Sequence, residues 1–208
     1  MKNLEAIQLT QEHLIGVGYH KATYVHPGDS SLCVKIPFTM NDIDLERELK
    51  YRAVRTKRKQ SSTLLPEYLG TIATNKGTGY IFERICDYDG QTSLTLTEYI
   101  DSVLNSKNIC DTKKHFHDLL ATFYHTWIAE KIVTSDVDPL NFLVQRKSET
   151  EAVIRIVDNI GTPVLIPLAF YIDSIAERRI KRYWKRFLNH LKRKTKLEAE
   201  TLELLSNL

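Results

Sequence analysis

The segment SDVDPLNFLV, from Ser135 to Val144, and the segment VIRIVDNIG, from Val153 to Gly161, carry the strongest indication of the fold. The first places the carboxylate of Asp136 and the amide of Asn141 directly before an apolar strand. The second ends an apolar strand in Asp158. Taken alone, either segment is most simply explained as a polar turn, because Asp, Asn, Pro and Gly commonly form turns. Their order, each beside an apolar strand of one predicted hairpin, favours a common site, and Asp and Asn oxygens suit Mg²⁺.

Two features upstream could complete such a site. Gly16-Val17-Gly18 lies between two strand-like runs, where backbone N–H groups can approach phosphate, although alone it usually marks only a hairpin. Lys35 lies in the following apolar strand. A lysine there is usually solvated through its flexible stem unless a carboxylate faces it. Glu48 in the next predicted helix provides one, and Glu46 is the competing candidate on a different face.

The periodicity of apolar residues predicts the remaining elements. Strands are expected at Leu14–Val17, Ala22–His26, Leu32–Pro37, Tyr68–Ala73 and Gly79–Ile85, with a helix over Asp42–Lys57. Further on, a helix carrying Phe116 to Ile128, hairpin strands at Phe142–Gln145 and Ala152–Val157, and a final helix over Asp173–Arg193 are expected. This order predicts an α+β fold. Residues 1–85 would form an antiparallel sheet with one helix, and residues 86–208 a mainly helical part.

Composition and charge narrow the class of protein. With 42% hydrophobic and 26% charged residues the chain is an ordinary globular protein, without a membrane-spanning run or a secretory signal. Cys33, Cys86 and Cys110 have no metal-type spacing, so we expect reduced thiols and a cytoplasmic protein. No motif supports a zinc site or a hydrolase.

The net charge of +3 conceals a basic final helix, because Arg178 to Lys196 holds ten Lys or Arg residues and no acid. Such a face could bind nucleic acid or an anionic membrane. We favour a basic face that is exposed only to solvent over one that binds a partner, because the aromatic residues of this helix lie on its apolar side. A second basic run, Arg47 to Lys59, would change this balance if it lay beside the final helix.

The order of these motifs resembles that of a protein kinase. Leu32 to Lys35 looks like the kinase V-A-I-K motif, Asp136 to Asn141 like its D-x-x-x-x-N loop, and Asp158 to Gly161 like D-F-G with one extra residue. More closely, the chain resembles the YrbL family of PhoP regulatory network proteins. That resemblance rests on the segments GTGY (77–80), SLTLTEYI (93–100), Pro-x-Asn, DNIG and LIPLA (165–169). It implies a minimal kinase-like fold with two lobes and a reduced C-terminal lobe.

The resemblance implies that residues of the first strands and of the helix after them hold ATP. Gly16 and Gly18 would cover its phosphates, and Lys35 would bind the α- and β-phosphates while paired with Glu48. Cys33 would lie over the adenine, in a place where kinases carry a small residue.

The resemblance further implies a hinge, a metal site and a catalytic residue. The backbone from Glu83 to Ile85 would bind adenine, and Asn141 and Asp158 would bind Mg²⁺. Asp136 would orient or deprotonate the acceptor hydroxyl. A small molecule is the favoured acceptor, because the short stretch after Asp158 leaves no room for the full peptide-binding lobe.

Departures from the kinase pattern keep alternatives open. Lys21 stands in the place of the third glycine, Thr134-Ser135 in the place of His-Arg, and Asp138 in the place of a lysine that balances phosphate charge. An acid there adds repulsion unless a metal or another base compensates. The alternatives to a phosphotransferase are a pseudokinase that acts on a regulatory protein partner without turnover, and a nucleic-acid-binding protein.

Overall fold

The computed structural model describes residues 6–39, 42–106, 112–164, 166–197, 199–206 and 208. Its first part is an antiparallel five-stranded sheet, ordered β1-β2-β3-β5-β4, after a short 3₁₀ helix at Gln11–His13. The strands are β1 (Leu14–Val17), β2 (Lys21–His26), β3 (Asp29–Pro37), β4 (Tyr68–Thr74) and β5 (Gly77–Glu83). This confirms the antiparallel sheet predicted from the sequence.

Within the described residues, helix α1 (Ile43–Lys57) is the one α-helix between these strands. Asp42 caps its N-terminus by accepting hydrogen bonds from the N–H groups of Asp44 and Leu45 at 2.9 and 3.1 Å. Its buried face carries Leu45 and Tyr51. The centre of the Tyr51 ring lies 4.5 Å from that of the Phe170 ring, in the loop just before the last long helix. The helix therefore joins the sheet to the rest of the molecule.

The second part consists of helices around a small sheet, ordered β6-β7-β8. Its elements are β6 (Leu94–Thr95), α2 (Leu96–Ser106), α3 (Thr112–Glu130), a 3₁₀ turn at Pro139–Asn141, β7 (Phe142–Arg146), β8 (Ala152–Ile156), a 3₁₀ turn at Leu168–Phe170, α4 (Asp173–Lys194) and α5 (Ala199–Ser206). The predicted hairpin and both predicted helices are confirmed, whereas β6, α2 and α5 were not predicted.

One aromatic-rich core lies within this helical part. Phe123, Trp127, Phe142, Trp184 and Phe187 are at most 2% exposed and lie in ring contact with one another. Both indole N–H groups are satisfied, since Trp127 donates to the Ile132 carbonyl at 2.7 Å and Trp184 to the Leu205 carbonyl at 2.9 Å. The apolar side of α4 belongs to this core, which leaves its bases outside, as predicted.

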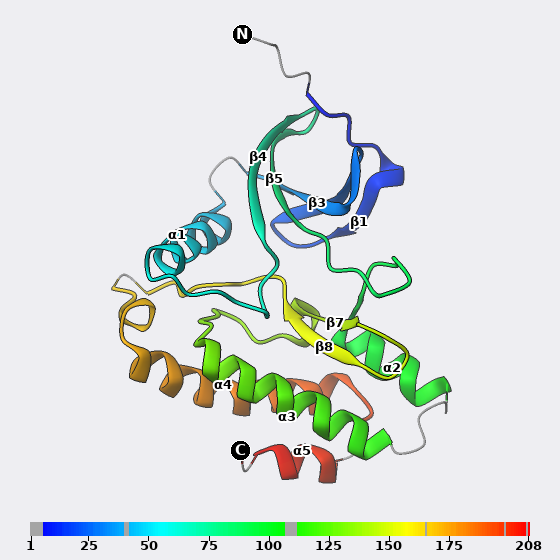
Figure 1. Cartoon of the computed structure of the whole chain (residues 1–208), viewed down its shortest axis with the longest axis vertical. Helices are drawn as coiled ribbons and strands as arrows, with labels where there is room; N and C mark the ends of the chain where they lie inside the picture. The colour runs from blue at the N-terminus through cyan, green and yellow to red at the C-terminus, as the bar shows by residue number, and fades with distance from the viewer. Residues whose placement is uncertain (1–5, 40–41, 107–111, 165, 198, 207) are drawn as a thin grey trace.

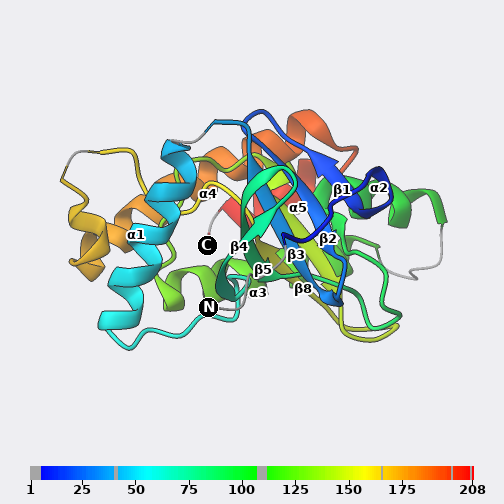
Figure 2. The ribbon, with the colours of Figure 1, turned by 90° about the horizontal axis from the view of Figure 1, so that it is seen from above.

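The sheet stands above the helical part, with the β7–β8 hairpin between them and α1 at one side (Figure 1). Seen from above, α1 crosses over the start of α4 (Figure 2). The fold is α+β, as predicted. Within the described ranges, no helix is long and apolar enough to cross a membrane. Cys33 and Cys86 are free thiols, and the prediction for Cys110 falls outside those ranges.

Candidate functional site

A cavity of about 200 Å³ lies where the sheet meets the β7–β8 hairpin. Its walls come from β1, β2, β3, β5 and both ends of the hairpin. Seven of the residues singled out in the sequence line it: Gly16, Cys33, Lys35, Glu83, Ile85, Asn141 and Asp158. Gly18, Glu48 and Asp136 do not line it.

Lys35 is buried at the inner wall of this cavity. Its Nζ donates to the Val157 carbonyl at 2.7 Å and lies 4.5 Å from the centre of the Phe82 ring. Glu48, also buried, instead accepts from Arg52 Nε at 2.9 Å, one helical turn along α1. The expected pair between Lys35 and Glu48 is thus not formed in this structure: Lys35 binds a backbone carbonyl and Glu48 binds Arg52.

Lys21 provides the cation that faces Asp158. Its Nζ lies 2.6 Å from Asp158 Oδ1; the Lys21 side chain is buried, and that of Asp158 is partly exposed. Burial by itself would raise the pKa of Asp158, but the charges of Lys35 and Lys21 and the hydrogen bond from Lys21 hold that pKa below its ordinary value. Asp158 is therefore ionised at neutral pH.

Asp136 is held against Asn141, which lines the cavity. Asn141 Nδ2 donates to Asp136 Oδ2 at 3.1 Å, while the Val137 N–H donates to Asp136 Oδ1 at 2.7 Å. The Val157 N–H donates to the Asn141 carbonyl at 3.0 Å, which brings Asn141 beside the strand end that carries Asp158. Asn141 and Asp158 thus both line the cavity, and Asp136 is held against Asn141.

Asp138 has a compensating base, which sequence analysis could not supply. Lys194, at the end of α4, places its Nζ 2.8 and 2.5 Å from the two carboxylate oxygens of Asp138. Burial would raise the pKa of Asp138, but the hydrogen bond and charge of Lys194 lower it overall. The negative charge at this place is thus neutralised within the chain.

Backbone hydrogen bonds join the two loops behind the site. The Ser135 N–H donates to the Asn159 carbonyl at 2.8 Å, and the Gly161 N–H donates to the Val133 carbonyl at 2.7 Å. Gly161 has a φ of 95°, and a Cβ atom there would lie 2.9 Å from the Arg47 side chain. Only glycine suits both the backbone conformation and the space.

The glycines of the first turn have a simpler role. The Gly18 N–H donates to the Lys21 carbonyl at 2.9 Å and closes the turn between β1 and β2. A Cβ atom at Gly16 would meet nothing within 4 Å. The turn therefore leaves open space beside Gly16, at the rim of the cavity.

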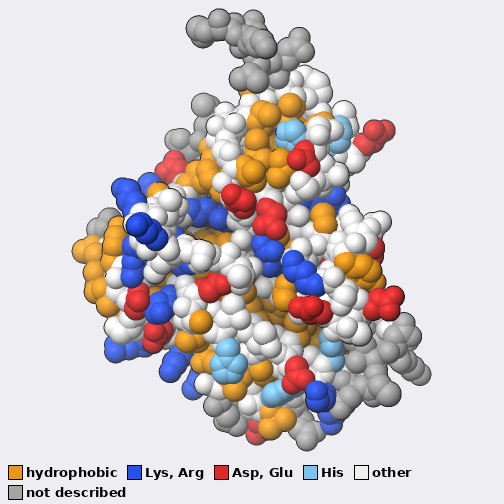
Figure 3. Space-filling model, in the orientation of Figure 1, with side chains coloured by type: hydrophobic (Ala, Val, Ile, Leu, Met, Phe, Trp, Pro, Cys, Tyr) orange, Lys and Arg blue, Asp and Glu red, His pale blue; other side chains and the backbone are white. Residues whose placement is uncertain are grey.

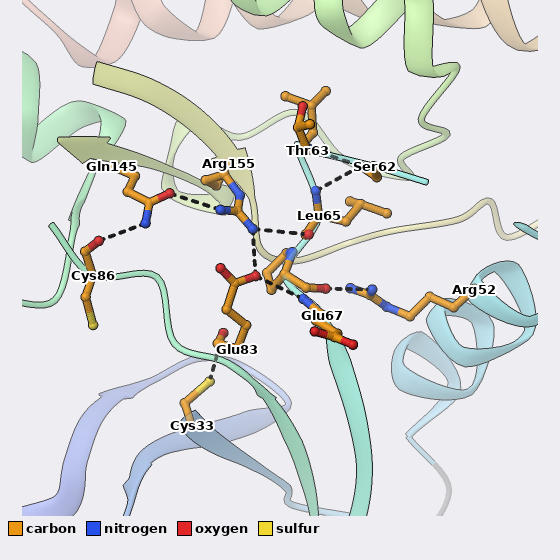
Figure 4. A network of polar contacts seen from close by, with 12 residues as sticks. Cys33, Arg52, Ser62, Thr63, Leu65, Glu67, Glu83, Cys86, Gln145 and Arg155 are labelled. Carbon is orange, nitrogen blue, oxygen red and sulfur yellow. Dashed lines mark hydrogen bonds and ion pairs between the residues drawn. The ribbon is translucent and has the colours of Figure 1, made fainter. Parts of the chain in front are cut away.

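A polar network anchors the end of β5 and the segment that follows it (Figure 4). Glu83 Oε2 accepts from Arg155 at 2.7 Å and from the Glu67 N–H at 3.1 Å. Arg155 also donates to Gln145, whose Nε2 donates to the Cys86 carbonyl at 2.8 Å. The Glu83 side chain thus points toward the β7–β8 hairpin. Residues Glu83 to Ile85 line the cavity.

On the cavity side, two backbone groups of this segment have defined neighbours. The Cys33 thiol lies 3.8 Å from the Glu83 carbonyl, and the Ile85 carbonyl accepts from the Ser93 N–H at 3.0 Å. Burial raises the pKa of Cys33, so its thiol stays protonated and acts as a small apolar group in the wall.

Residues 7–192 match the family model described as PhoP regulatory network protein YrbL. The chain belongs to the YrbL family. It is 36% identical over 185 residues to the "Uncharacterized protein YrbL" of Escherichia coli (strain K12), with 88% of this chain and 86% of that protein covered. The protein of the same name from Shigella flexneri matches with the same figures.

The part of the chain matched to the YrbL family contains the whole cavity and both groups of the ion pair between Lys21 and Asp158. Lys194 lies beyond residue 192, so the pair with Asp138 joins a matched residue to one outside the match.

Sequence reasoning noted Lys21 only as a substitute for a glycine, and it did not single out Arg155 or Lys194. The position of Lys21 could have indicated its role, because its strand, β2, pairs with β3, the strand that carries Lys35. Arg155 lies in an otherwise apolar strand, and a charged residue in such a strand indicates that it has a buried partner.

Proposed function

We propose that this protein binds Mg-ATP, or a related nucleotide, between its sheet and its β7–β8 hairpin, in a minimal kinase-like fold of two lobes. The observation that carries this proposal is that one cavity is lined by residues from five segments, each of which was assigned a nucleotide or metal role. A hinge backbone, a buried lysine and a paired amide and carboxylate are the parts that phosphoryl transfer uses.

The donor set fits a magnesium ion that is shared with phosphates. Asp158 is ionised, and the Asn141 oxygen is directed away from the hydrogen bond that its Nδ2 donates to Asp136. No group of three or more His, Cys, Asp or Glu side chains among the described residues could hold a metal alone. Mg²⁺ needs no such cage, because it keeps waters and binds substrate phosphates alongside one or two protein oxygens.

Lys21 makes the site responsive to the metal. The cavity of about 200 Å³ is smaller than the roughly 300–1,000 Å³ of typical ligand sites, and the pair between Lys21 and Asp158 closes one part of it. A metal held by Asp158 would take over the role of counter-ion. Lys21 would then be free to bind phosphate beside Lys35, in place of the lysine that kinases carry where Asp138 stands.

The remaining residues suit transfer to a hydroxyl. Asp136, positioned by Asn141, would orient the acceptor, and Lys35 and Lys21 would neutralise charge on the phosphates. Lys194 removes the repulsion that the Asp138 carboxylate would add. A small molecule remains the proposed acceptor class.

A regulatory module without turnover is the second candidate. Glu48 is bound to Arg52, and Lys35 to a backbone carbonyl, so the ion pair that kinases need for activity is not assembled. The family description names a regulatory network, which agrees with a protein that responds to nucleotide by contacting a partner.

Thermal unfolding with and without Mg-ATP tests nucleotide binding. Ligand at about a hundred times its dissociation constant adds about 2.7 kcal/mol, which raises the midpoint by about 5–10 °C for a protein of this size. We expect this rise to need magnesium and to be lost in Asp158→Asn. The exposed Asp118→Asn variant serves as the control and should keep it. No rise at millimolar Mg-ATP would contradict the proposal.

Asp136→Ala then separates the two candidates. For a phosphotransferase, this variant keeps the thermal shift but loses release of ADP in the presence of acceptors. For a regulatory module, wild type and Asp136→Ala both bind nucleotide and neither turns it over. ADP release measured by coupled assay across a panel of small hydroxyl compounds distinguishes these outcomes.

A further inference from the structure

A groove separate from the nucleotide cavity runs between α1 and the start of α4. It consists of two cavities of about 570 and 460 Å³ that share Thr162 and Val164 in their walls. One is bordered by α1 and the other by α4. We call this surface, with the loop described at 163–164 and 166–172, the α1–α4 groove.

The α1–α4 groove exposes large apolar side chains. Ile43 is 75% exposed, Ile166 69% and Tyr171 59%, and Val164 and Leu168 are each about half exposed. Figure 3 shows hydrophobic side chains gathered at the left edge of the molecule, over the loop that precedes α4. Exposed apolar patches of this kind with a polar rim mark interaction sites, because a lone monomer gains nothing from exposing them.

The rim of the groove is basic on both sides. Lys50 and Lys57 border it from α1, and Arg178 and Arg182 border it from α4, whereas Glu46 is the one acid in either wall. Lys57 and Arg178 have no ion-pair partner within the part of the chain that the structure describes. Figure 3 shows Lys and Arg side chains above and below the apolar edge.

The two basic runs noted in the sequence meet at this groove. Arg58, after the end of α1, pairs with Asp173 at the start of α4 at 2.8 Å and donates to the Phe170 carbonyl at 2.7 Å. This contact brings the Arg47–Lys59 run beside the first turns of α4. Around its apolar centre the joint surface therefore carries more bases than acids, and the nearby acids Asp173 and Glu177 face Arg58 and Lys131.

We propose that the α1–α4 groove docks an acidic segment of a partner protein. Apolar side chains of that segment fill the two cavities, and its carboxylates face the lysines and arginines of the rim. The buried apolar area supplies the affinity, and the charges select an acidic partner and speed its association.

The charge and shape of the groove argue against other occupants. A second copy of this chain, docked by the same patch, would bring two basic rims together. A bilayer favours protruding apolar side chains on a flat face, whereas this surface is hollowed by two cavities. Nucleic acid would use the bases but not the apolar cavities, since most of its contacts are to phosphate and sugar.

A selection experiment tests this proposal without a known partner. A displayed library of random peptides is selected on the wild-type protein, with counter-selection on the double variant Ile166→Ser/Tyr171→Ser. Both positions are exposed, so the variant should fold as wild type does, which the thermal midpoint checks. We expect the enriched peptides to combine several Asp or Glu residues with at least two large apolar residues.

Charge variants on one helix provide the matched control. For an enriched peptide, Arg178→Glu/Arg182→Glu should weaken binding at least about tenfold, measured by fluorescence anisotropy. Lys185→Glu/Lys192→Glu makes the same change in net charge outside the groove and should change binding less than about twofold. Both pairs lie on exposed positions of α4.

Three outcomes would overturn the proposal. The first is that no peptide survives the counter-selection, or that survivors lack acids. The second is an equal loss of affinity in both charge variants, which would indicate attraction by net charge alone. The third is groove-dependent binding to vesicles of phosphatidylglycerol and phosphatidylcholine, or to duplex DNA, without any enriched peptide. None of these outcomes depends on whether Mg-ATP binds.

Discussion

Among the described residues, one continuous apolar cluster fills the helical part, whereas two small clusters lie in the sheet and between the sheet and α1. The large cluster reaches from Tyr51 on α1 through α3 and the hairpin to Leu205 on α5. In the sheet, one cluster surrounds Leu9, Val34 and Ile36, and another joins Cys33, Leu45 and Phe82.

Polar contacts join the sheet to the helical part beside the cavity. Arg155 binds Glu83 and Lys21 binds Asp158, each at 2.6–2.7 Å. Lys35 reaches the Val157 carbonyl from the same sheet. Apolar packing holds the helical part in one arrangement, while polar contacts can exchange partners. The contacts that can exchange partners therefore lie at the boundary between the sheet and the helical part.

Truncation of one leucine in each region should produce the largest contrast. Leu191→Ala opens the large cluster, where Leu191 is fully buried, and should lower the free energy of unfolding by about 4–5 kcal/mol. Leu9→Ala, in the small cluster of the sheet, should cost only about 2–3 kcal/mol because the site can collapse further. Urea unfolding measures both, and equal losses would show that the two regions share one core.

Removal of Arg155 should have a smaller effect, centred on the boundary. Arg155→Met keeps the apolar volume but removes the donor of Gln145 and leaves Glu83 only the hydrogen bond from the Glu67 N–H, and we expect a loss of about 1–3 kcal/mol. Glu83→Gln in the same background should add little, because the two side chains act on each other. Additive losses in the double-variant cycle would contradict this coupling.

Lys194→Ala should have the smallest effect, and that effect should depend on pH. Lys194 lowers the pKa of Asp138, so the pair stabilises the fold above the ordinary carboxyl pKa, and this stabilisation is lost as pH falls through the lowered pKa. We expect a penalty of at most about 1 kcal/mol at pH 7 and almost none near pH 2.

Urea unfolding of wild type and Lys194→Ala at both pH values measures this difference. Lys192→Ala, also on the last turn of α4 and exposed, serves as the control and should show no such dependence. A penalty of the same size at both pH values would assign the effect of Lys194 to packing.

The sequence by itself determined most of the local structure. Alternating apolar residues between turns identified the five strands of the sheet, and the spacing of Phe116 to Ile128 identified α3, since both patterns report which side of an element is buried. Short elements escaped detection: β6 has two residues and α5 has eight, too few for a period to show.

The tertiary structure decided which charged groups meet. Sequence order suggested Lys35 for Glu48, but Arg52 lies one turn away on the same helix and takes that carboxylate. Lys21 reaches Asp158 across 137 residues, and Lys194 reaches Asp138 across 56. Periodicity reports the burial of a residue and not its partner, because an ion pair depends on the distance between segments that only folding brings together.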